Sequence, residues 1–232
     1  MKNYSIAIDG PAASGKSTAA KLISKKLNFL YVDTGAMYRA VTLLMLEKGL
    51  DCKSESDAAS ILDECSIKED RDGKVYLNGK DVTQRVRMPD VSSNVSYACA
   101  HLCVREKLVE LQREMAKGEN VIMDGRDIGT VVLKDATLKI YQIASSLARA
   151  QRRQKENVEK GISFASVEEI QKDIEKRDAI DSSRANSPLK PAEDSITLDT
   201  SDLTIEEEVN EIINLFRKKI GEIEWKLLVQ SL

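Results

Sequence analysis

The sequence is poor in the residues that build disulfide and metal sites. Its 232 residues include one histidine and four irregularly spaced cysteines. A chain this long is not a disulfide-stapled miniprotein, because it can bury a substantial core without cross-links. Cys99 and Cys103 are four residues apart, so we expect them on one side of a helix with His101 pointing elsewhere. Buried thiols are therefore favoured over a zinc site for these two and for Cys52 and Cys65.

Long hydrophobic runs and an excess of positive charge are also missing. No apolar run approaches the roughly 20 residues that cross a bilayer. The start of the chain reaches Asp9 and Gly10 too soon to supply the roughly 7–15-residue apolar segment of a secretory signal, so we expect a cytoplasmic protein with no membrane partner. Lys and Arg number 35 against 38 Asp and Glu, and aromatic residues make up 4% of the chain. The chain therefore has no net positive charge to attract nucleic acid and few aromatic side chains on which bases could stack. Any phosphate binding must come from local clusters of residues.

Short apolar runs alternate with helical stretches, which predicts an α/β fold with a parallel sheet. The runs cover residues 4–8, 29–32, 120–123, 138–143 and 195–198. Two capping-box patterns, beginning at Ser166 and Thr204, predict helix starts, and the second helix should continue to about Ile220. Ligands of such sheets bind beyond the carboxyl ends of the strands.

Two segments depart from this alternation. Between residues 66 and 82, Asp72-Gly73 and Asn78-Gly79 bracket a short β-prone run, a pattern of antiparallel strands joined by tight turns. Between residues 148 and 184, a basic helix, a turn at Gly161 and a second helix predict a mobile lid.

Residues 10–17, Gly-Pro-Ala-Ala-Ser-Gly-Lys-Ser, match G-x-x-x-x-G-K-[ST] at every fixed position, between a predicted strand and a predicted helix. The chemistry requires glycines so that backbone N–H groups can surround phosphate oxygens, a lysine charge, and a hydroxyl for Mg²⁺. Gly10, Gly15, Lys16 and Ser17 fill these positions. The pattern predicts binding of a nucleoside triphosphate, but not what is done with it.

Three further clusters of charged and polar residues lie at the ends of predicted strands or on one predicted helix. Residues 33–39, Asp-Thr-Gly-Ala-Met-Tyr-Arg, suit the binding of a second phosphate-bearing ligand. The alternative is that Thr34 only caps a helix and that Arg39 is a solvated charge. Residues 124–130, Asp-Gly-Arg-Asp-Ile-Gly-Thr, place two acids and an arginine at another strand end, where a surface turn is the alternative. Arg177 and Arg184 would share one helix face if the segment is helical throughout, as a phosphate clamp or as part of a solvated charged helix.

Taken together, these stretches resemble the bacterial cytidylate kinases, which transfer the γ-phosphate of ATP to CMP or dCMP. The resemblance extends to about Ile220 and rests most on residues 33–39 and 124–132, and on the Lys-Arg-Asp-x-x-Asp-x-x-Arg stretch at 176–184. It implies a P-loop nucleoside-monophosphate kinase fold, with a five-stranded parallel sheet flanked by helices. It also implies one domain: a core of residues 1–60, 98–147 and 185–221, a β-rich monophosphate-binding insert at about 61–97, a helical lid at about 148–184, and a tail at 222–232.

The resemblance also implies roles for individual residues. The ATP phosphates would be held by Gly10, Pro11, Ala12, Ala13, Ser14, Gly15, Lys16, Ser17 and Thr18, with Mg²⁺ on Ser17. The lid arginines would be Arg149, Arg152 and Arg153. The acceptor would be bound by Asp33, Thr34, Arg39, Ser96, Arg105, Arg126, Asp127, Arg177, Asp181 and Arg184. Of these, Arg126, Asp127, Arg177 and Arg184 join Lys16 at the catalytic centre. Asp181 would bind the sugar, and Ser96, Arg105 and Asp127 the cytosine edge.

One region departs from the family pattern. The family carries a small-residue run with a proline before Val104-Arg105, where this chain has Tyr97-Ala98-Cys99-Ala100-His101-Leu102-Cys103. Counting back from Arg105 selects Ser96, but Ser92 and Ser93 are close enough to leave the choice open.

Two rival functions fit the phosphate loop. One is another small-molecule kinase on the same core, acting on UMP, AMP or a non-nucleotide acceptor. The other is a nucleotide switch or RNA-binding protein, against which the missing N-K-x-D element and the near-neutral charge both weigh. We expect a monomer that binds small molecules and not nucleic acid.

Overall fold

The computed structural model describes residues 3–230. Residues 1–2 of the predicted core and 231–232 of the predicted tail lie outside the described residues. A five-stranded parallel sheet forms the centre, with strand order β2-β6-β1-β7-β8. The strands are β1 (Ser5–Asp9), β2 (Leu30–Asp33), β6 (Val121–Gly125), β7 (Leu138–Ile143) and β8 (Ile196–Asp199). The predicted five-stranded parallel sheet is confirmed, and every predicted run forms a strand within two residues of its expected bounds.

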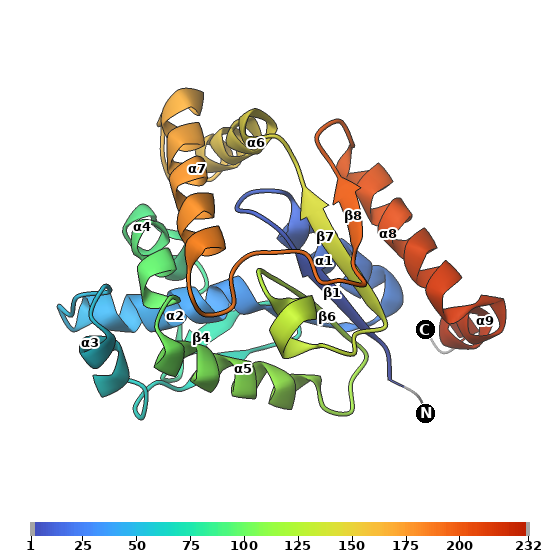
Figure 1. Cartoon of the computed structure of the whole chain (residues 1–232), viewed down its shortest axis with the longest axis horizontal. Helices are drawn as coiled ribbons and strands as arrows, with labels where there is room; N and C mark the ends of the chain where they lie inside the picture. Colours follow the sequence, from blue (N-terminus) through green and yellow to red (C-terminus); the bar gives the residue numbers. More distant parts are fainter. Residues whose placement is uncertain (1–2, 231–232) are drawn as a thin grey trace.

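Helices cover both faces of this sheet, and α6 and α7 form a separate pair beyond the ends of its strands (Figure 1). The helices are α1 (Lys16–Leu27), α2 (Thr34–Glu47), α3 (Glu55–Ser60), α4 (Pro89–Ala98), α5 (Leu102–Ala116), α6 (Ser146–Glu159), α7 (Val167–Ser183), α8 (Ile205–Ile220) and α9 (Glu222–Gln230). Short helical turns lie at η1 (Arg85–Arg87) and at the π-helix η2 (Ile128–Val132). Both capping boxes are present, at Ser166 and at Thr204, and α8 ends at Ile220 as expected.

Alternation along the strands divides the core into two clusters. On β1, Ile6 and Ile8 face a cluster built on α1 and α8, whereas Ala7 faces one built on α2, α4 and α5. Side chains of successive strand residues point to opposite faces, so one strand serves both clusters. Such two-sided burial is why the central strands are almost continuously apolar.

The segment between α3 and α4 forms the predicted antiparallel strands. They are β3 (Ile67–Glu69), β4 (Val75–Leu77) and β5 (Lys80–Asp81). Gly73 and Asn78-Gly79 supply the positive φ angles of the two turns. Ile67, Val75 and Leu77 are buried in the cluster of α2, so this small sheet is packed onto the core.

The predicted single helix through Cys99 and Cys103 is wrong. Helix α4 ends at Ala98, and α5 begins only at Leu102, after His101 adopts an extended conformation. The His101 ring is held by the carbonyl of Cys52, with 2.9 Å between Nε2 and O. The two cysteines therefore belong to different segments: Cys99 is buried against α4 and Cys103 is half-buried on α5.

The tail forms α9, which packs beside α8. The Trp225 ring meets that of Phe216 edge-on at 6.4 Å between centroids, and Phe216 meets Tyr4 and Phe29 in the same manner. The Tyr4 hydroxyl donates to Glu224 Oε2 at 2.7 Å. Figure 1 shows α9 on the far side of the sheet from α6 and α7. Among the described residues, no helix is long and apolar enough to cross a membrane.

Candidate active site

The phosphate loop lies at the carboxyl end of β1, where the chain turns into α1. A side chain at Gly10 would place its Cβ only 2.0 Å from the carbonyl oxygen of Gln142, so the close approach of β7 requires glycine there. Lys16 folds back over the loop, with its Nζ 2.6 Å from the carbonyl of Pro11 and 3.1 Å from Ser14 Oγ. Burial and the nearby Arg126 lower the pKa of Lys16 to about 7, while Asp124 and Asp9 oppose the shift. A phosphate anion beside this ammonium would restore its charge.

Asp124, which belongs to the predicted 124–130 cluster but was given no individual role there, joins the loop to the neighbouring strand ends. Ser17 Oγ donates to Asp124 Oδ2 and Tyr31 Oη donates to Oδ1, each at 2.7 Å. The Asp124 carbonyl accepts from Thr34 Oγ1 at 2.7 Å. A hydroxyl and a carboxylate beside a phosphate-binding loop form the kind of oxygen set that holds Mg²⁺ together with substrate phosphates. The strand-end position of Asp124 was visible in the sequence, but its contact with Ser17, 107 residues away, was not.

A pocket beside the loop collects most of the predicted acceptor residues. It is lined by Thr34, Gly35, Tyr38, Val95, Cys99, Arg105, Gly125, Arg126, Asp127, Arg177, Asp181 and Arg184. Several buried donor atoms around it have no hydrogen-bond partner within residues 3–230. They are Tyr38 Oη, Arg39 Nε, Arg105 Nε, Arg177 Nε and Arg184 Nη2. Unsatisfied buried donors are costly, so this set indicates a site for an acceptor-rich anion.

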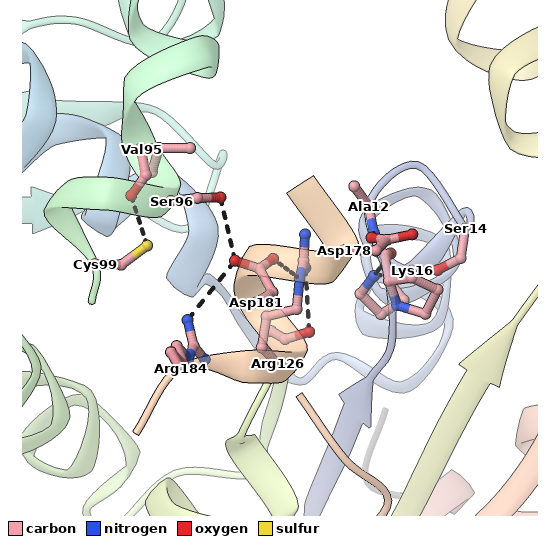
Figure 2. A network of polar contacts seen from close by, with 12 residues as sticks. Ala12, Ser14, Lys16, Val95, Ser96, Cys99, Arg126, Asp178, Asp181 and Arg184 are labelled. Atoms are coloured by element: carbon pink, nitrogen blue, oxygen red, sulfur yellow. Dashed lines mark hydrogen bonds and ion pairs between the residues drawn. The ribbon is translucent and has the colours of Figure 1, made fainter. Parts of the chain in front are cut away.

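Asp181 organises the arginines of this pocket. Figure 2 shows its carboxylate between Ser96, Arg126 and Arg184. Arg126 Nε donates to Oδ2 at 2.9 Å, Ser96 Oγ donates to Oδ1 at 3.1 Å, and Arg184 Nη1 lies 3.8 Å from Oδ1. Burial alone would raise the pKa of Asp181, but Arg126, Arg177 and Arg184 together hold it below its usual range. The helix α7 ends at Ser183, so Arg184 follows the helix instead of belonging to it, yet it lines the same pocket as Arg177.

The three candidate serines differ in their surroundings. Ser96 is buried and faces Asp181, whereas Ser92 Oγ lies 3.5 Å from the carbonyl of Arg87 and the exposed Ser93 donates to the carbonyl of Asp90. Ser96 is thus the one that reaches a pocket-lining residue.

Arg105 and Asp127 form a buried ion pair at the end of this pocket. Arg105 also donates to the carbonyl of Cys99 at 3.0 Å, and its guanidinium lies 5.2 Å from the centre of the Tyr38 ring. Both charges are almost fully shielded from water. A polar pair held this rigidly can discriminate between bases, because a base without the matching groups leaves it unpaired.

The residues following β2 depart from the competing interpretation of a capped, solvated helix. Asp33, not Thr34, caps α2, since its Oδ1 accepts from the N–H of Ala36 at 2.8 Å. Arg39 is largely shielded, with 14% of its side chain exposed, and pairs with Asp33 at 3.3 Å. Arg87, which the sequence interpretation missed, pairs with Asp33 at 2.8 Å. Although burial alone would raise it, these two arginines hold the pKa of Asp33 at about 2. Neither Asp33 nor Arg39 is among the residues that line the pocket. Arg39 lies next to the lining residue Gly35, since a Cβ on that glycine would come within 3.1 Å of Arg39 Nη1.

The small sheet reaches this cluster through Glu69. Its Oε2 accepts from the N–H of Asp33 at 2.9 Å. Burial, together with the charge of Asp33, raises the pKa of Glu69 well above its usual range. The contact links the β3–β5 segment to the acceptor side of the site.

Of the three α6 arginines, two contact the phosphate loop. Arg149 Nη1 donates to the carbonyl of Ala12 at 3.0 Å. Arg152 lies 3.4 Å from the carbonyl of Ser14 and also donates to the carbonyl of Thr200. Arg153 is half-exposed and lies 4.0 Å from Glu156. Thr18, in the first turn of α1, is exposed.

Comparisons with known proteins agree with this geometry. The family model described as cytidylate kinase matches residues 6–218. A cytidylate kinase of Limosilactobacillus reuteri is 48% identical over 225 residues, which cover 96% of this chain and 99% of the relative. One of Lactobacillus johnsonii is 51% identical over 217 residues, covering 92% of this chain and 94% of the relative.

Among solved structures, an uncharacterized protein of Eubacterium ventriosum is similar with a TM-score of 0.51 at 14% identity, covering 94% of this chain and 99% of the other. That likeness concerns the fold alone. The match of the family model and the extent and identity of the relatives show that this chain belongs to the cytidylate kinase family.

Proposed function

We propose that the protein transfers the γ-phosphate of ATP to CMP or dCMP, giving ADP and CDP or dCDP. The observation that carries this is the pocket of unsatisfied arginine donors directly beside the phosphate loop. Family membership and the names of the relatives support the choice of cytidine monophosphate as acceptor.

The donor phosphates are assigned to the loop at residues 10–18. Its backbone N–H groups and the Lys16 ammonium would surround the phosphate oxygens at the start of α1. Arg149 and Arg152 contact the loop already, so we infer that α6 and α7 form a lid whose closure excludes water. Mg²⁺ would be held by Ser17 and Asp124, and when bound it supplies charge neutralisation on the transferring phosphoryl group.

The acceptor is assigned to the neighbouring pocket. Thr34, Arg39 and Arg126 suit its phosphate, and Arg177 and Arg184, which share the pocket, suit the phosphates being joined. Asp181 is assigned to the sugar. Ser96, Arg105 and Asp127 are assigned to the cytosine edge, where the buried ion pair gives base discrimination.

The proposed mechanism is direct in-line transfer. A monophosphate oxygen is a competent nucleophile, so Asp127 orients the acceptor and is not required as a base. Lys16 and the arginines stabilise the charge that spreads over the transferred group, and the protein performs little covalent chemistry. We expect the active protein to be a monomer in the cytoplasm, where its nucleotide substrates occur.

The test is ADP formation from Mg-ATP with CMP, dCMP, UMP, AMP, GMP and dTMP supplied singly, and with no acceptor. Turnover with CMP and dCMP well above the others supports both the reaction and the cytosine assignment. Preference for another monophosphate would remove the roles of Ser96, Arg105 and Asp127. Turnover indifferent to every acceptor, or polynucleotide binding that weakens steeply with salt, would favour the nucleotide-switch alternative.

Lys16→Ala is the matching variant. It removes the loop cation, and we expect at least about a hundredfold loss of turnover with the fold retained, because electrostatic groups of this kind contribute that much to a transition state. Near-normal turnover in the folded variant would refute the mechanism.

A further inference from the structure

The Asp178 carboxylate on α7 joins the phosphate loop to both helices of the α6–α7 pair. Its Oδ1 accepts from the N–H of Ala12 at 3.1 Å, and its Oδ2 accepts from Arg149 Nη1 at 2.5 Å. The same Arg149 nitrogen donates to the Ala12 carbonyl at 3.0 Å. Ala12 is therefore held at its N–H from α7 and at its C=O from α6. Figure 2 shows Asp178 beside Ala12 and Lys16.

The ion pair between Arg149 and Asp178 is largely shielded from solvent. The side chain of Arg149 is 8% exposed and that of Asp178 is 18% exposed. Charge-assisted hydrogen bonds shielded from water are stronger than exposed ion pairs. A third bond, from Arg149 Nε to the Ala144 carbonyl at 3.0 Å, also holds the guanidinium. The guanidinium thus has one defined place beside the loop.

The same helix carries the acceptor contacts. Asp181, one turn beyond Asp178, holds Arg126 and Ser96, and Arg177 lines the acceptor pocket. Because α7 is a continuous helix from Val167 to Ser183, fixing it on Ala12 also fixes the acceptor-side groups relative to the donor loop. In-line transfer needs reacting atoms within about 3–3.5 Å of each other, and a displacement of about 1 Å can cost a hundredfold in rate.

From this geometry we propose that Asp178 is a positioning residue for phosphoryl transfer. It acts through Arg149 and Ala12 and does not touch the reacting atoms. These contacts hold the lid helices in a fixed position relative to the phosphate loop. This inference rests on the proposed function only in taking the reaction to be phosphoryl transfer from ATP.

The experiment compares Asp178→Asn and Asp178→Ala with a matched control, Asp173→Asn, which removes an exposed carboxylate from the same helix. Asparagine keeps an acceptor for the Ala12 N–H but loses the charge that holds Arg149, and alanine loses both. We expect kcat with CMP to fall about tenfold in Asp178→Asn and further in Asp178→Ala. The ratio of the rate of ATP hydrolysis without acceptor to the rate of transfer to CMP should rise about tenfold. The reason is that moving α7 relative to the loop slows transfer to the acceptor more than it changes the access of water to ATP. Asp173→Asn should match the wild type.

A purely structural role would lower the melting temperature and the active fraction but leave the hydrolysis-to-transfer ratio unchanged, and that result would overturn the proposal. A second readout does not depend on which acceptor is used. Hydrogen exchange of the amides in residues 9–17, measured without nucleotide, should be about tenfold faster in Asp178→Ala than in the wild type and unchanged in Asp173→Asn. Unchanged exchange in Asp178→Ala overturns the proposal even if the wild-type protein proves to use an acceptor other than CMP.

Discussion

Glu208 is a buried carboxyl group behind the phosphate loop, and its replacement by glutamine should change the pH dependence of stability. It lies in the first turn of α8 with 2% of its surface exposed. A Cβ on Gly15 would come within 3.2 Å of Glu208 Oε2. Glu208 Oε1 has no hydrogen-bond partner in the described part of the chain. Burial raises the pKa of Glu208 to about 7, against the opposing charge of Arg152.

The sign follows from proton binding. Between pH 4.5 and pH 7, the native carboxyl keeps a proton that the unfolded chain has lost, so the free energy of unfolding falls as the pH rises. A shift of one pKa unit corresponds to about 1.4 kcal/mol, which gives an upper bound of about 2.5 kcal/mol lost between pH 5 and pH 8. Glu208→Gln keeps the volume of the side chain and removes this loss. On going from pH 5 to pH 8, the unfolding free energy of the variant should therefore increase by about 2.5 kcal/mol relative to that of the wild type.

Urea unfolding of both proteins at pH 5 and pH 8 measures the difference directly. Glu206→Gln is the matched control, because Glu206 lies in the same helical turn but is exposed, and its stability difference from the wild type should be nearly independent of pH. If Glu208→Gln differs from the wild type by the same free energy at both pH values, the carboxyl does not retain a proton in the native state and the reasoning fails.

Three further substitutions test the core, the acceptor pocket and a helix cap. Phe216 is fully buried between three aromatic rings, so Phe216→Ala should cost about 3–5 kcal/mol in urea unfolding, and a loss below about 1 kcal/mol would contradict the packing. Arg105→Met leaves Asp127 buried without its partner. It should raise the KM for CMP at least about tenfold while the KM for ATP stays within about twofold, and equal changes in both would argue against a role in base recognition. Thr204→Ala removes the capping hydroxyl of α8 and should lower the unfolding free energy by about 1 kcal/mol. No change would mean that solvent replaces the cap.

The parts of the fold that depend on local sequence could be predicted from it. The strand runs, the turns at Gly73 and Gly79, and the capping boxes at Ser166 and Thr204 each depend on neighbouring residues, and the structure contains them all. The break at His101 was missed, and the contact made there joins the His101 ring to the Cys52 carbonyl, 49 residues away. Helical spacing between two cysteines contains no information about that contact.

In the site, as in the fold, local patterns could be predicted from the sequence and long-range contacts could not. The loop at residues 10–17 and the strand-end clusters have recognisable local patterns, and the structure brings residues of both strand-end clusters to one pocket. The contacts that orient them were not predicted. Asp124, Asp178 and Glu69 each act through partners between 29 and 166 residues away. A single sequence marks such acids only as ordinary charges, because their pairing depends on the completed fold.

The contact between α9 and the start of the chain has a consequence for how folding can be followed. Tyr4 and Glu224 are 220 residues apart, and joining them closes almost the whole chain into one loop. Contacts of such long sequence separation carry a large closure entropy and form after local structure has reduced it. Trp225, the only tryptophan, is seated on Phe216 at that closure. Its intrinsic fluorescence should therefore report the last stage of assembly without any label, at a place remote from the nucleotide sites.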